Sequence, residues 1–118
     1  MLQATMKYSS GWVALLSVIC SLLAVGSASA ERYGLVIGVS RYADAKLSAI
    51  PECRLDAYRM ATVLHDEWGV ATNCLTVLCD DQANRENVET AIREELGSKA
   101  SVDDEVVIYF SGHMAGNK

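Results

Sequence analysis

The sequence lacks the short motifs that identify the common metal and nucleotide sites. None of its four cysteines and two histidines stands in a Cys-x-x-Cys or His-x3-His spacing, so no metal site of that kind is predicted. There is no G-x-x-x-x-G-K-[S/T] segment, and Gly34 and Gly38 lie inside an apolar run rather than in a turn between strand and helix. These absences disfavour an unrelated nucleotide-binding or receiver-like module.

Charge is almost absent from the first 30 residues, where Lys7 is the only charged side chain. An apolar run follows at residues 12–25, and small residues with the pattern Ala28-x-Ala30 precede Glu31. The run has 14 residues, whereas a membrane-spanning helix needs about 20. This order predicts a secretory signal peptide over residues 1–30, cleaved on export, and a secreted or periplasmic protein. An uncleaved N-terminal membrane anchor is the alternative.

Basic residues are scarce in the rest of the chain. Without residues 1–30, nine Lys and Arg face fifteen Asp and Glu, a formal charge of −6, and no run of basic residues occurs. An acidic chain of this kind is a poor binder of nucleic acids and of anionic membranes. We therefore expect no nucleic-acid partner.

Three cysteines remain in residues 31–118, namely Cys53, Cys74 and Cys79. Export would place them in an oxidising compartment, where disulfides can form. Cys74 and Cys79 flank one predicted strand, which separates them by about 16 Å, too far for a disulfide bond. We interpret all three as small buried hydrophobic residues, and their disulfide state stays open.

Apolar runs and helical periodicities alternate along residues 31–118. The segment "RYGLVIGVS" at residues 32–40, "NCLTVLC" at residues 73–79 and "EVVIYF" at residues 105–110 predict buried strands. Residues 52–69 predict a helix that begins near Pro51 and ends at Gly69. Its apolar positions are Leu55, Tyr58, Val63, Leu64 and Trp68.

A second amphipathic helix is predicted between the last two strands. Asn84 suits its N-cap, Gly97 its end, and Val88, Ile92 and Leu96 recur at a spacing of four. Strands that alternate with helices form right-handed βαβ crossovers and a parallel sheet. The predicted fold class is therefore α/β, a βαβαβ parallel sheet with flanking helices, with ligands expected at the carboxyl ends of the strands.

The order of four segments resembles the caspase-like fold. These are "RYGLVIGVSRY", "PECRLDAYRMATVLHDEWGV", "LTVLCDDQANRENVETAIREEL" and "DDEVVIYFSGH", which together cover residues 32–113. They are most similar to metacaspases and bacterial caspase homologues, peptidase family C14. The resemblance implies a three-layer αβα fold, of which residues 31–118 form the N-terminal portion of a caspase-like (p20) domain. It also implies a cysteine-type endopeptidase, a hydrolase that acts on protein or peptide substrates.

The resemblance implies roles for three residues. His113 in "YFSGH" matches the catalytic histidine, which activates the cysteine and protonates the leaving amine. Gly112 matches the glycine whose neighbourhood helps to form the oxyanion hole. Asp56 in "CRLDA" matches an aspartate that lines the S1 pocket in metacaspases and paracaspases and pairs with an Arg or Lys P1 residue. A carboxylate is a good partner for a guanidinium group, which it can bind in a bidentate manner.

Two features depart from the family pattern. Met114 stands where the family usually has glycine, and a side chain there would crowd the oxyanion region. The nucleophile implied by the family lies on the next strand in an Asp-x-Cys context, about 50 residues after the histidine, and residues 31–118 contain no such motif. We therefore expect completion by a missing C-terminal part or a partner chain. The alternative is a non-catalytic caspase-like protein or interaction module.

The remaining polar residues near the strand ends suggest nothing specific. Arg41 and Tyr42 are interpreted as a solvated loop arginine and a packed ring, and Asp80 and Asp81 as loop and helix-start residues. No cofactor is predicted. Some metacaspases need calcium, but no spacing of acidic residues here resembles an EF-hand loop.

Overall fold

The protein contains a three-stranded parallel sheet. The computed structural model describes residues 29–114, so most of the predicted signal peptide lies outside the described residues. The strands are β1 (Arg32–Gly38), β2 (Leu75–Cys79) and β3 (Glu105–Ser111). Their order is β2-β1-β3, with Gly38 opposite both Cys79 and Ser111. All three strands therefore end at the same edge of the sheet.

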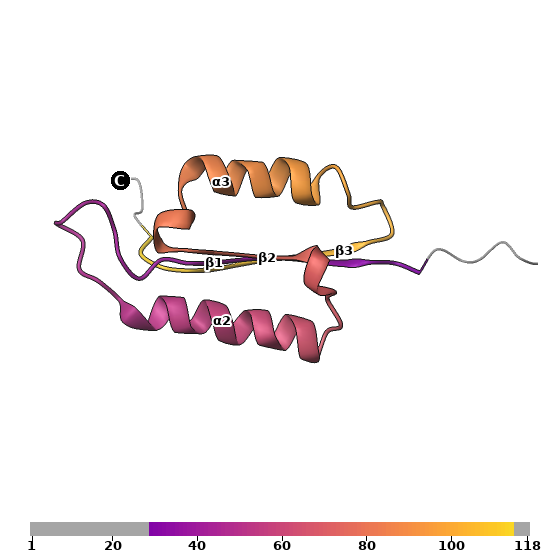
Figure 1. The fold of residues 1–118 in the computed structure, drawn as a ribbon, viewed down its shortest axis with the longest axis horizontal. Helices are drawn as coiled ribbons and strands as arrows, with labels where there is room; N and C mark the ends of the chain where they lie inside the picture. The colour runs from indigo at the N-terminus through magenta and orange to yellow at the C-terminus, as the bar shows by residue number, and fades with distance from the viewer. Residues whose placement is uncertain (1–28, 115–118) are drawn as a thin grey trace, which may run out of the picture.

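Helices cover both faces of this sheet (Figure 1). Helix α2 (Pro51–Asp66) lies on one face, and helix α3 (Arg85–Thr90) with its π-helical continuation η3 (Ala91–Leu96) lies on the other. Two 3-10 turns, η1 (Thr72–Cys74) and η2 (Asp80–Gln82), flank β2. The three layers confirm the predicted α/β class with flanking helices. Within residues 29–114, no helix has the length and apolar character needed to cross a membrane.

Strand β1 forms the centre of the core, because it is buried on both faces. Alternate side chains enter two hydrophobic clusters, one under each helix layer. On the α2 side the buried members are Val36, Ala57, Ala61, Leu64, Val70 and Cys79. On the α3 side they are Tyr33, Leu35, Ile37, Ala91 and Leu96. This two-sided burial explains why β1 is apolar without interruption after Arg32.

The buried face of α2 differs from the prediction. Of the five apolar positions that the periodicity indicates, only Leu64 is buried, and the other four are 41–50% exposed. Small residues face the sheet instead, namely Cys53, Ala57 and Ala61. The reason is the close approach of the helix to Gly38, where a Cβ atom would lie 2.5 Å from the Ala57 Cβ and 2.6 Å from the Cys53 carbonyl oxygen.

The second helix region also corrects the predicted spacing. The Asn84 N-cap is confirmed, since its side chain accepts a hydrogen bond from the Asn87 N–H at 2.9 Å. Ile92, however, is 46% exposed, while Ala91 and Leu96 are buried. The Gly97 N–H donates to the Ile92 carbonyl five residues earlier, a π-helical bond that inserts one extra residue in the turn. That insertion moves Ile92 away from the sheet.

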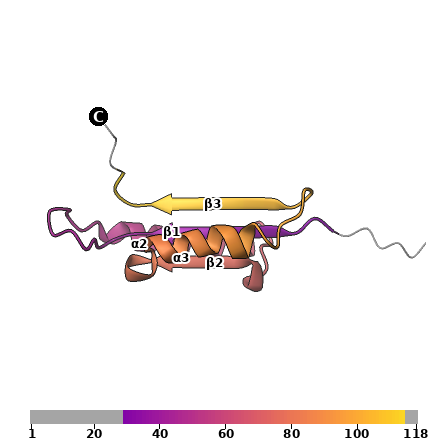
Figure 2. The ribbon, with the colours of Figure 1, turned by 90° about the horizontal axis from the view of Figure 1, so that it is seen from above.

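Strand β3 was predicted to be buried, but it is an edge strand with one uncovered face and no fully buried residue. Seen from above (Figure 2), α3 lies over β1 and β2, and β3 runs beside them without α3 over it. Val107 and Tyr109 pack against the α2 cluster, whereas Val106, Ile108 and Phe110 are 44–54% exposed. The stripe formed by Val106, Ile108 and Phe110 is therefore apolar and unpartnered within the described residues.

Candidate active site

The carboxyl ends of β1 and β3 bring two distant segments together. The Val39 N–H, directly after β1, donates to the Ser111 carbonyl at 2.9 Å. The chain then forms a loop, residues 41–49, before α2 begins. His113 follows β3 by two residues and lies beside this loop. The predicted candidate residue therefore stands at the edge of the sheet where parallel α/β folds bind ligands.

Two residues of the loop hold His113. Its imidazole Nε2 lies 3.0 Å from the Ser48 carbonyl oxygen, and its backbone N–H donates to the Tyr42 hydroxyl at 2.5 Å. The Tyr42 and His113 rings are tilted by 51° with their centroids 5.1 Å apart. His113 itself remains exposed. The histidine is thus fixed at its backbone and at one ring nitrogen while the ring still faces solvent.

The contact with Ser48 selects one form of the imidazole. A carbonyl oxygen only accepts hydrogen bonds, so Nε2 must carry the proton. In the neutral ring the lone pair is then on Nδ1, and Nδ1 is the nitrogen able to take a proton from another group. A backbone carbonyl thus does for this ring what a carboxylate does in a Ser-His-Asp triad, namely orient it and select its tautomer.

Gly112 has a steric reason to be glycine. A Cβ atom at this position would lie 2.8 Å from the Tyr42 hydroxyl oxygen and 2.9 Å from Phe110 Cζ. Any side chain would therefore push Tyr42 away from the backbone N–H of His113. Met114, which departs from the family pattern, is 86% exposed, so its side chain extends into solvent.

Asp56 lies one turn into α2, with its side chain 42% exposed. It forms an ion pair with Arg59 on the same helix, with 3.7 Å between Oδ1 and Nη1. Within residues 29–114, no hydrogen bond or ion pair joins Asp56 to His113 or to the loop that holds it. The structure therefore brings His113 and Gly112 into one constellation and leaves Asp56 as a separate, accessible carboxylate.

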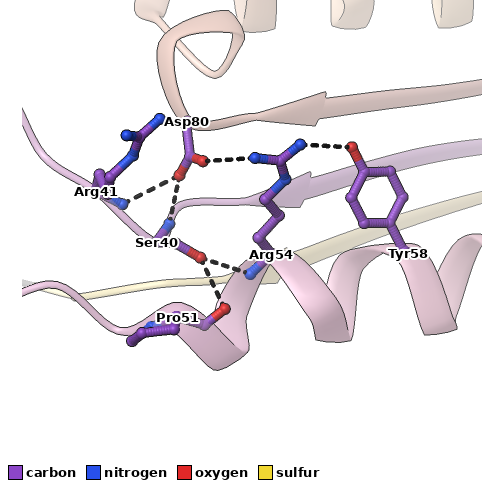
Figure 3. Close-up of polar contacts among 6 residues, drawn as sticks. All are labelled: Ser40, Arg41, Pro51, Arg54, Tyr58 and Asp80. Carbon is purple, nitrogen blue, oxygen red and sulfur yellow. Dashed lines mark hydrogen bonds and ion pairs between the residues drawn. The ribbon is translucent and has the colours of Figure 1, made fainter.

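A buried polar network ties the base of the loop together (Figure 3). Ser40 is 5% exposed, and its hydroxyl donates to the Pro51 carbonyl at 3.1 Å and accepts from the Arg54 N–H at 2.8 Å. The Ser40 carbonyl accepts from the Ile50 N–H at 2.9 Å. Because α2 has no capping side chain of its own at Ile50, Ser40 supplies the cap from the end of β1.

Asp80 and Arg54 complete this network. The Asp80 carboxylate accepts from the backbone N–H groups of Ser40 and Arg41 at 2.8 and 3.1 Å, and it lies 3.7 Å from Arg54 Nη1. The guanidinium also contacts the Tyr58 hydroxyl at 3.5 Å, and this hydrogen bond raises the pKa of Arg54. The arginine therefore stays charged beside the nearly buried carboxylate.

Sequence reasoning missed the residues that surround His113. Tyr42 was interpreted as a packed ring and Asp80 as a simple loop residue, whereas the first contacts His113 and the second anchors the loop. The detectable signal was their position directly after two strands that end at the same edge. Nothing in the sequence marks the Ser48 carbonyl, because any residue provides one.

No cysteine of the described region is hydrogen-bonded to His113, and none lies on a strand next to β3. Cys79 ends β2, which β1 separates from β3, and Cys74 lies before the opposite end of β2. Cys53, in the first turn of α2, and Cys79 are buried as predicted, whereas Cys74 is only partly buried, and all three are free thiols. Among residues 29–114, no group of three or more His, Cys, Asp or Glu side chains could hold a metal ion.

Comparison with known families places this geometry in a context. A family model for the caspase domain, peptidase family C14, matches residues 31–117. The chain belongs to the caspase family. The sheet, the two helix layers and the histidine after β3 all lie within the matched residues, and the match confirms the family resemblance that the sequence motifs suggested.

A curated relative refines the comparison. Metacaspase-1B from Aspergillus oryzae is 33% identical over 88 residues, which cover 70% of this chain and 20% of the relative. The chain therefore spans about a fifth of the length of the metacaspase that it matches. The similarity supports the metacaspase branch named from the sequence, and it concerns only that part of the relative.

Proposed function

We propose that this chain supplies the general base of a cysteine endopeptidase, with His113 as that base. The observation that supports the proposal most strongly is the contact between His113 Nε2 and the Ser48 carbonyl, in a chain of the caspase family. It leaves Nδ1 free at the carboxyl edge of the sheet, where a nucleophile and a peptide can approach.

The chemistry follows from the free Nδ1 atom. Nδ1 accepts the proton of a cysteine thiol, and the resulting thiolate attacks the carbonyl carbon of the peptide bond. The imidazolium then returns this proton to the leaving amine, so that an acyl-enzyme thioester and a free amine result. Water hydrolyses the thioester and restores the thiol. Ser48 keeps the proton on Nε2 throughout, because its carbonyl cannot take it.

The thiol that His113 serves is proposed to lie outside residues 29–114. Cys53 and Cys79 are buried, and none of the three described cysteines follows a strand next to β3. A strand that paired in parallel with the free edge of β3 would place its own carboxyl end beside His113. We therefore infer that a further strand carries the nucleophile, and that this strand belongs either to a C-terminal part of the same polypeptide or to a partner chain.

The substrate is proposed to be a protein or peptide with Arg or Lys at P1. Asp56 is the proposed partner of that side chain, since its carboxylate is 42% exposed and its only ion pair among the described residues is with its helix neighbour Arg59. A surface ion pair of this kind is weak, so a substrate guanidinium can replace it.

A second candidate function is a non-catalytic interaction module. The unpaired edge of β3 and the apolar stripe Val106, Ile108 and Phe110 favour it, because exposed strand edges recruit additional strands. In this alternative the same surface binds a partner, and His113 has only a structural contact with the loop.

Export through a cleaved signal peptide over residues 1–30 remains part of the proposal, with an N-terminal anchor as the alternative. The mass of the protein recovered from the producing cells tests it. A polypeptide that begins at Glu31 supports cleavage. A chain that retains residues 1–30 and sediments with membranes contradicts it.

Peptide hydrolysis tests the catalytic proposal. We expect the purified full chain to show no turnover of fluorogenic peptides with Arg, Lys or Asp at P1, because no described thiol meets His113. We expect the coding sequence after the Lys118 codon to encode a further strand that is followed by an Asp-x-Cys motif, about 50 residues after His113. The longer product should hydrolyse the Arg and Lys peptides, and His113→Ala should abolish this activity. Turnover by the 118-residue chain that His113→Ala abolishes would show that one of its own cysteines is the nucleophile.

The role of Asp56 has a matched control on the same helix. In the longer product, Asp56→Asn should raise KM for the Arg peptide by about tenfold or more, since charge-assisted bidentate bonds are lost. Asp66→Asn removes an exposed carboxylate ten residues, or nearly three turns, further along α2 and should leave KM unchanged. Equal effects of the two substitutions would contradict a specific S1 role.

A further inference from the structure

Asp80 has an unusual backbone conformation for a residue with a side chain. Its φ angle is +48°, in the left-handed region, which L-residues rarely adopt, although Asp and Asn do so more readily than most, and which costs about 1–2 kcal/mol. Its side chain is nevertheless only 7% exposed. A strained backbone with a nearly buried carboxylate requires contacts that offset both costs, and these contacts indicate what the residue does.

Among the described residues, the hydrogen bonds and the ion pair of the Asp80 carboxylate all lead to the base of the His113 loop. Oδ1 accepts from two successive backbone N–H groups, those of Ser40 and Arg41, and Oδ2 faces Arg54 in the first turn of α2 (Figure 3). The carboxylate therefore joins the end of β2 to the first residues after β1 and to the start of α2. It binds both sides of the loop formed by residues 41–49.

The contacts of this loop with His113 suggest its role in the described structure. Tyr42 is one residue beyond Arg41, and its hydroxyl accepts from the His113 backbone N–H. Ser48 is two residues before Ile50, whose N–H closes the loop on the Ser40 carbonyl. Both atoms that hold His113 are therefore within two residues of a position that Asp80 or Ser40 fixes.

We propose that Asp80 is a positioning residue for His113, which acts through the loop of residues 41–49 to keep the Ser48 carbonyl on Nε2. Within the described residues, no hydrogen bond or ion pair joins Asp80 to His113. Without its carboxylate the loop loses two charge-assisted hydrogen bonds at its entrance, and the contact between Ser48 and His113 opens more often. The positioning of His113 by Asp80 does not depend on the proposed function, but its importance for catalysis rests on His113 being the general base.

The test is the exchange of the imidazole N–H protons with water, measured by NMR on the purified full chain labelled with ¹⁵N-histidine. The protein has two histidines. His65 serves as an internal reference, because its Nδ1 lies 2.8 Å from the Val70 carbonyl and therefore carries the proton. We expect a protected Nε2–H on His113 and a protected Nδ1–H on His65. Because the two histidines are protonated on different ring nitrogens, their N–H signals can be assigned separately.

Asp80→Gly removes the carboxylate and accommodates the positive φ angle. We expect the His113 Nε2–H to exchange at least about tenfold faster, since hydrogen-bonded protons exchange when the bond opens, with His65 unchanged. Asp80→Asn keeps one acceptor oxygen but loses the charge, so its effect should be intermediate. Asp81→Gly, at the exposed neighbouring position, is the matched control and should leave both histidines as they are.

Several results would overturn the inference. A folded Asp80→Gly protein with unchanged His113 exchange contradicts it, as does an equal acceleration in Asp81→Gly. If Asp80→Gly does not fold by circular dichroism, the Asp80→Asn protein decides, and unchanged exchange there is also a contradiction. The measurement needs no turnover, so it separates the two proposals. Faster exchange together with peptide hydrolysis that survives His113→Ala would refute the proposed function and leave the positioning role intact.

Discussion

The two ends of the sheet use polar side chains in different ways. At the amino end, Arg32 and Glu105 form an ion pair at 2.6 Å with side chains 50 and 63% exposed, and the Glu31 N–H donates to Asp104. At the carboxyl end, Ser40 and Asp80 are 5 and 7% exposed and bind backbone groups of other elements. One end is closed by solvated contacts between neighbouring chain segments, and the other by buried contacts that fix a loop.

This difference follows from what each end must do. Exposed ion pairs contribute little to stability because water competes for both partners. Buried hydrogen bonds to backbone groups leave an unsatisfied donor or acceptor when they are lost, so they are more costly to remove. The carboxyl end carries the candidate base and has the buried contacts, so we expect it to be the more rigid end. The amino end only joins the strands to their preceding turns.

The largest expected effect is that of filling Gly38, at the carboxyl end of β1. A Cβ atom there meets Ala57 Cβ at 2.5 Å and the Cys53 carbonyl at 2.6 Å, both attached to the α2 backbone. Gly38→Ala should lower the free energy of unfolding by about 3 kcal/mol, because the helix must shift. Urea denaturation measures this value.

Gly34→Ala, nearer the amino end of β1, provides the comparison. Its Cβ would meet the ends of the Leu75 and Leu64 side chains at 2.7 and 3.1 Å, and these can rotate away. We expect a loss of only about 1 kcal/mol. If Gly34→Ala destabilised the protein as much as Gly38→Ala, the carboxyl end would not be the more rigid one.

The next effect concerns the buried hydroxyl of Ser40. Ser40→Ala removes the acceptor for the Arg54 N–H and should lower the free energy of unfolding by about 1–2 kcal/mol, as for the loss of a helix cap. Ser101→Ala at the amino end removes an exposed bond to Asp104 at 3.0 Å and should change stability by less than about 0.5 kcal/mol. Thermal unfolding measures the stability of both variants. An equal loss of stability in the two would contradict the difference between the ends of the sheet.

At the amino end, Tyr33 makes stability depend on pH. Its hydroxyl donates to Glu31 at 2.7 Å, and this hydrogen bond, with burial and the Glu31 charge, raises the pKa of Tyr33 to about 12. The folded state thus holds this proton more tightly than the unfolded state does. The stabilisation is complete below the ordinary tyrosine pKa of about 10 and is lost as pH rises towards 12.

NMR titration of the tyrosine ring carbons measures this shift. Glu31→Gln should move the Tyr33 midpoint back towards the ordinary value, since both the charge and the stronger acceptor are lost. Glu52→Gln removes an exposed acid in the first turn of α2 and should leave the midpoint in place. A wild-type midpoint near the ordinary value would show that the Glu31 contact does not persist in solution.

The smallest effect is expected for the ion pair of Arg32 and Glu105. A double-mutant cycle with Arg32→Gln and Glu105→Gln should give a coupling of about 0.2–1 kcal/mol, since both side chains are at least half exposed. The coupling should shrink further in 1 M salt. A coupling above about 2 kcal/mol that resists salt would show that the amino end is held as firmly as the carboxyl end.

The sequence predicted the elements better than their faces. The strands, the order of the helices and the Asn84 cap follow from local patterns, and the structure confirms them. The buried face of α2 was wrong, because its periodicity was taken from large apolar residues while Gly38 admits only small ones. Ile92 was wrongly predicted to be buried, because no local sequence pattern indicates the π-helical turn that changes the helical spacing there.

In the candidate site, too, the sequence predicted some residues, whereas their contacts appear only in the structure. "YFSGH" identified His113 and Gly112 through resemblance to the caspase family, to which the chain belongs. The contacts of His113 with Tyr42 and Ser48 join residues 71 and 65 positions apart, and the bonds of Asp80 to Ser40 and Arg41 span 40 and 39. No pattern within one segment reports such pairings.

By itself, the sequence determined the α/β class, the caspase resemblance and the histidine that follows the third strand, because strand and helix periodicities and a short motif are local properties. Only the tertiary structure decided which nitrogen of His113 contacts a backbone carbonyl, which loop holds it, and that Asp80 anchors this loop. Those features depend on where separate strands end relative to one another, and sheet order and register set that relation.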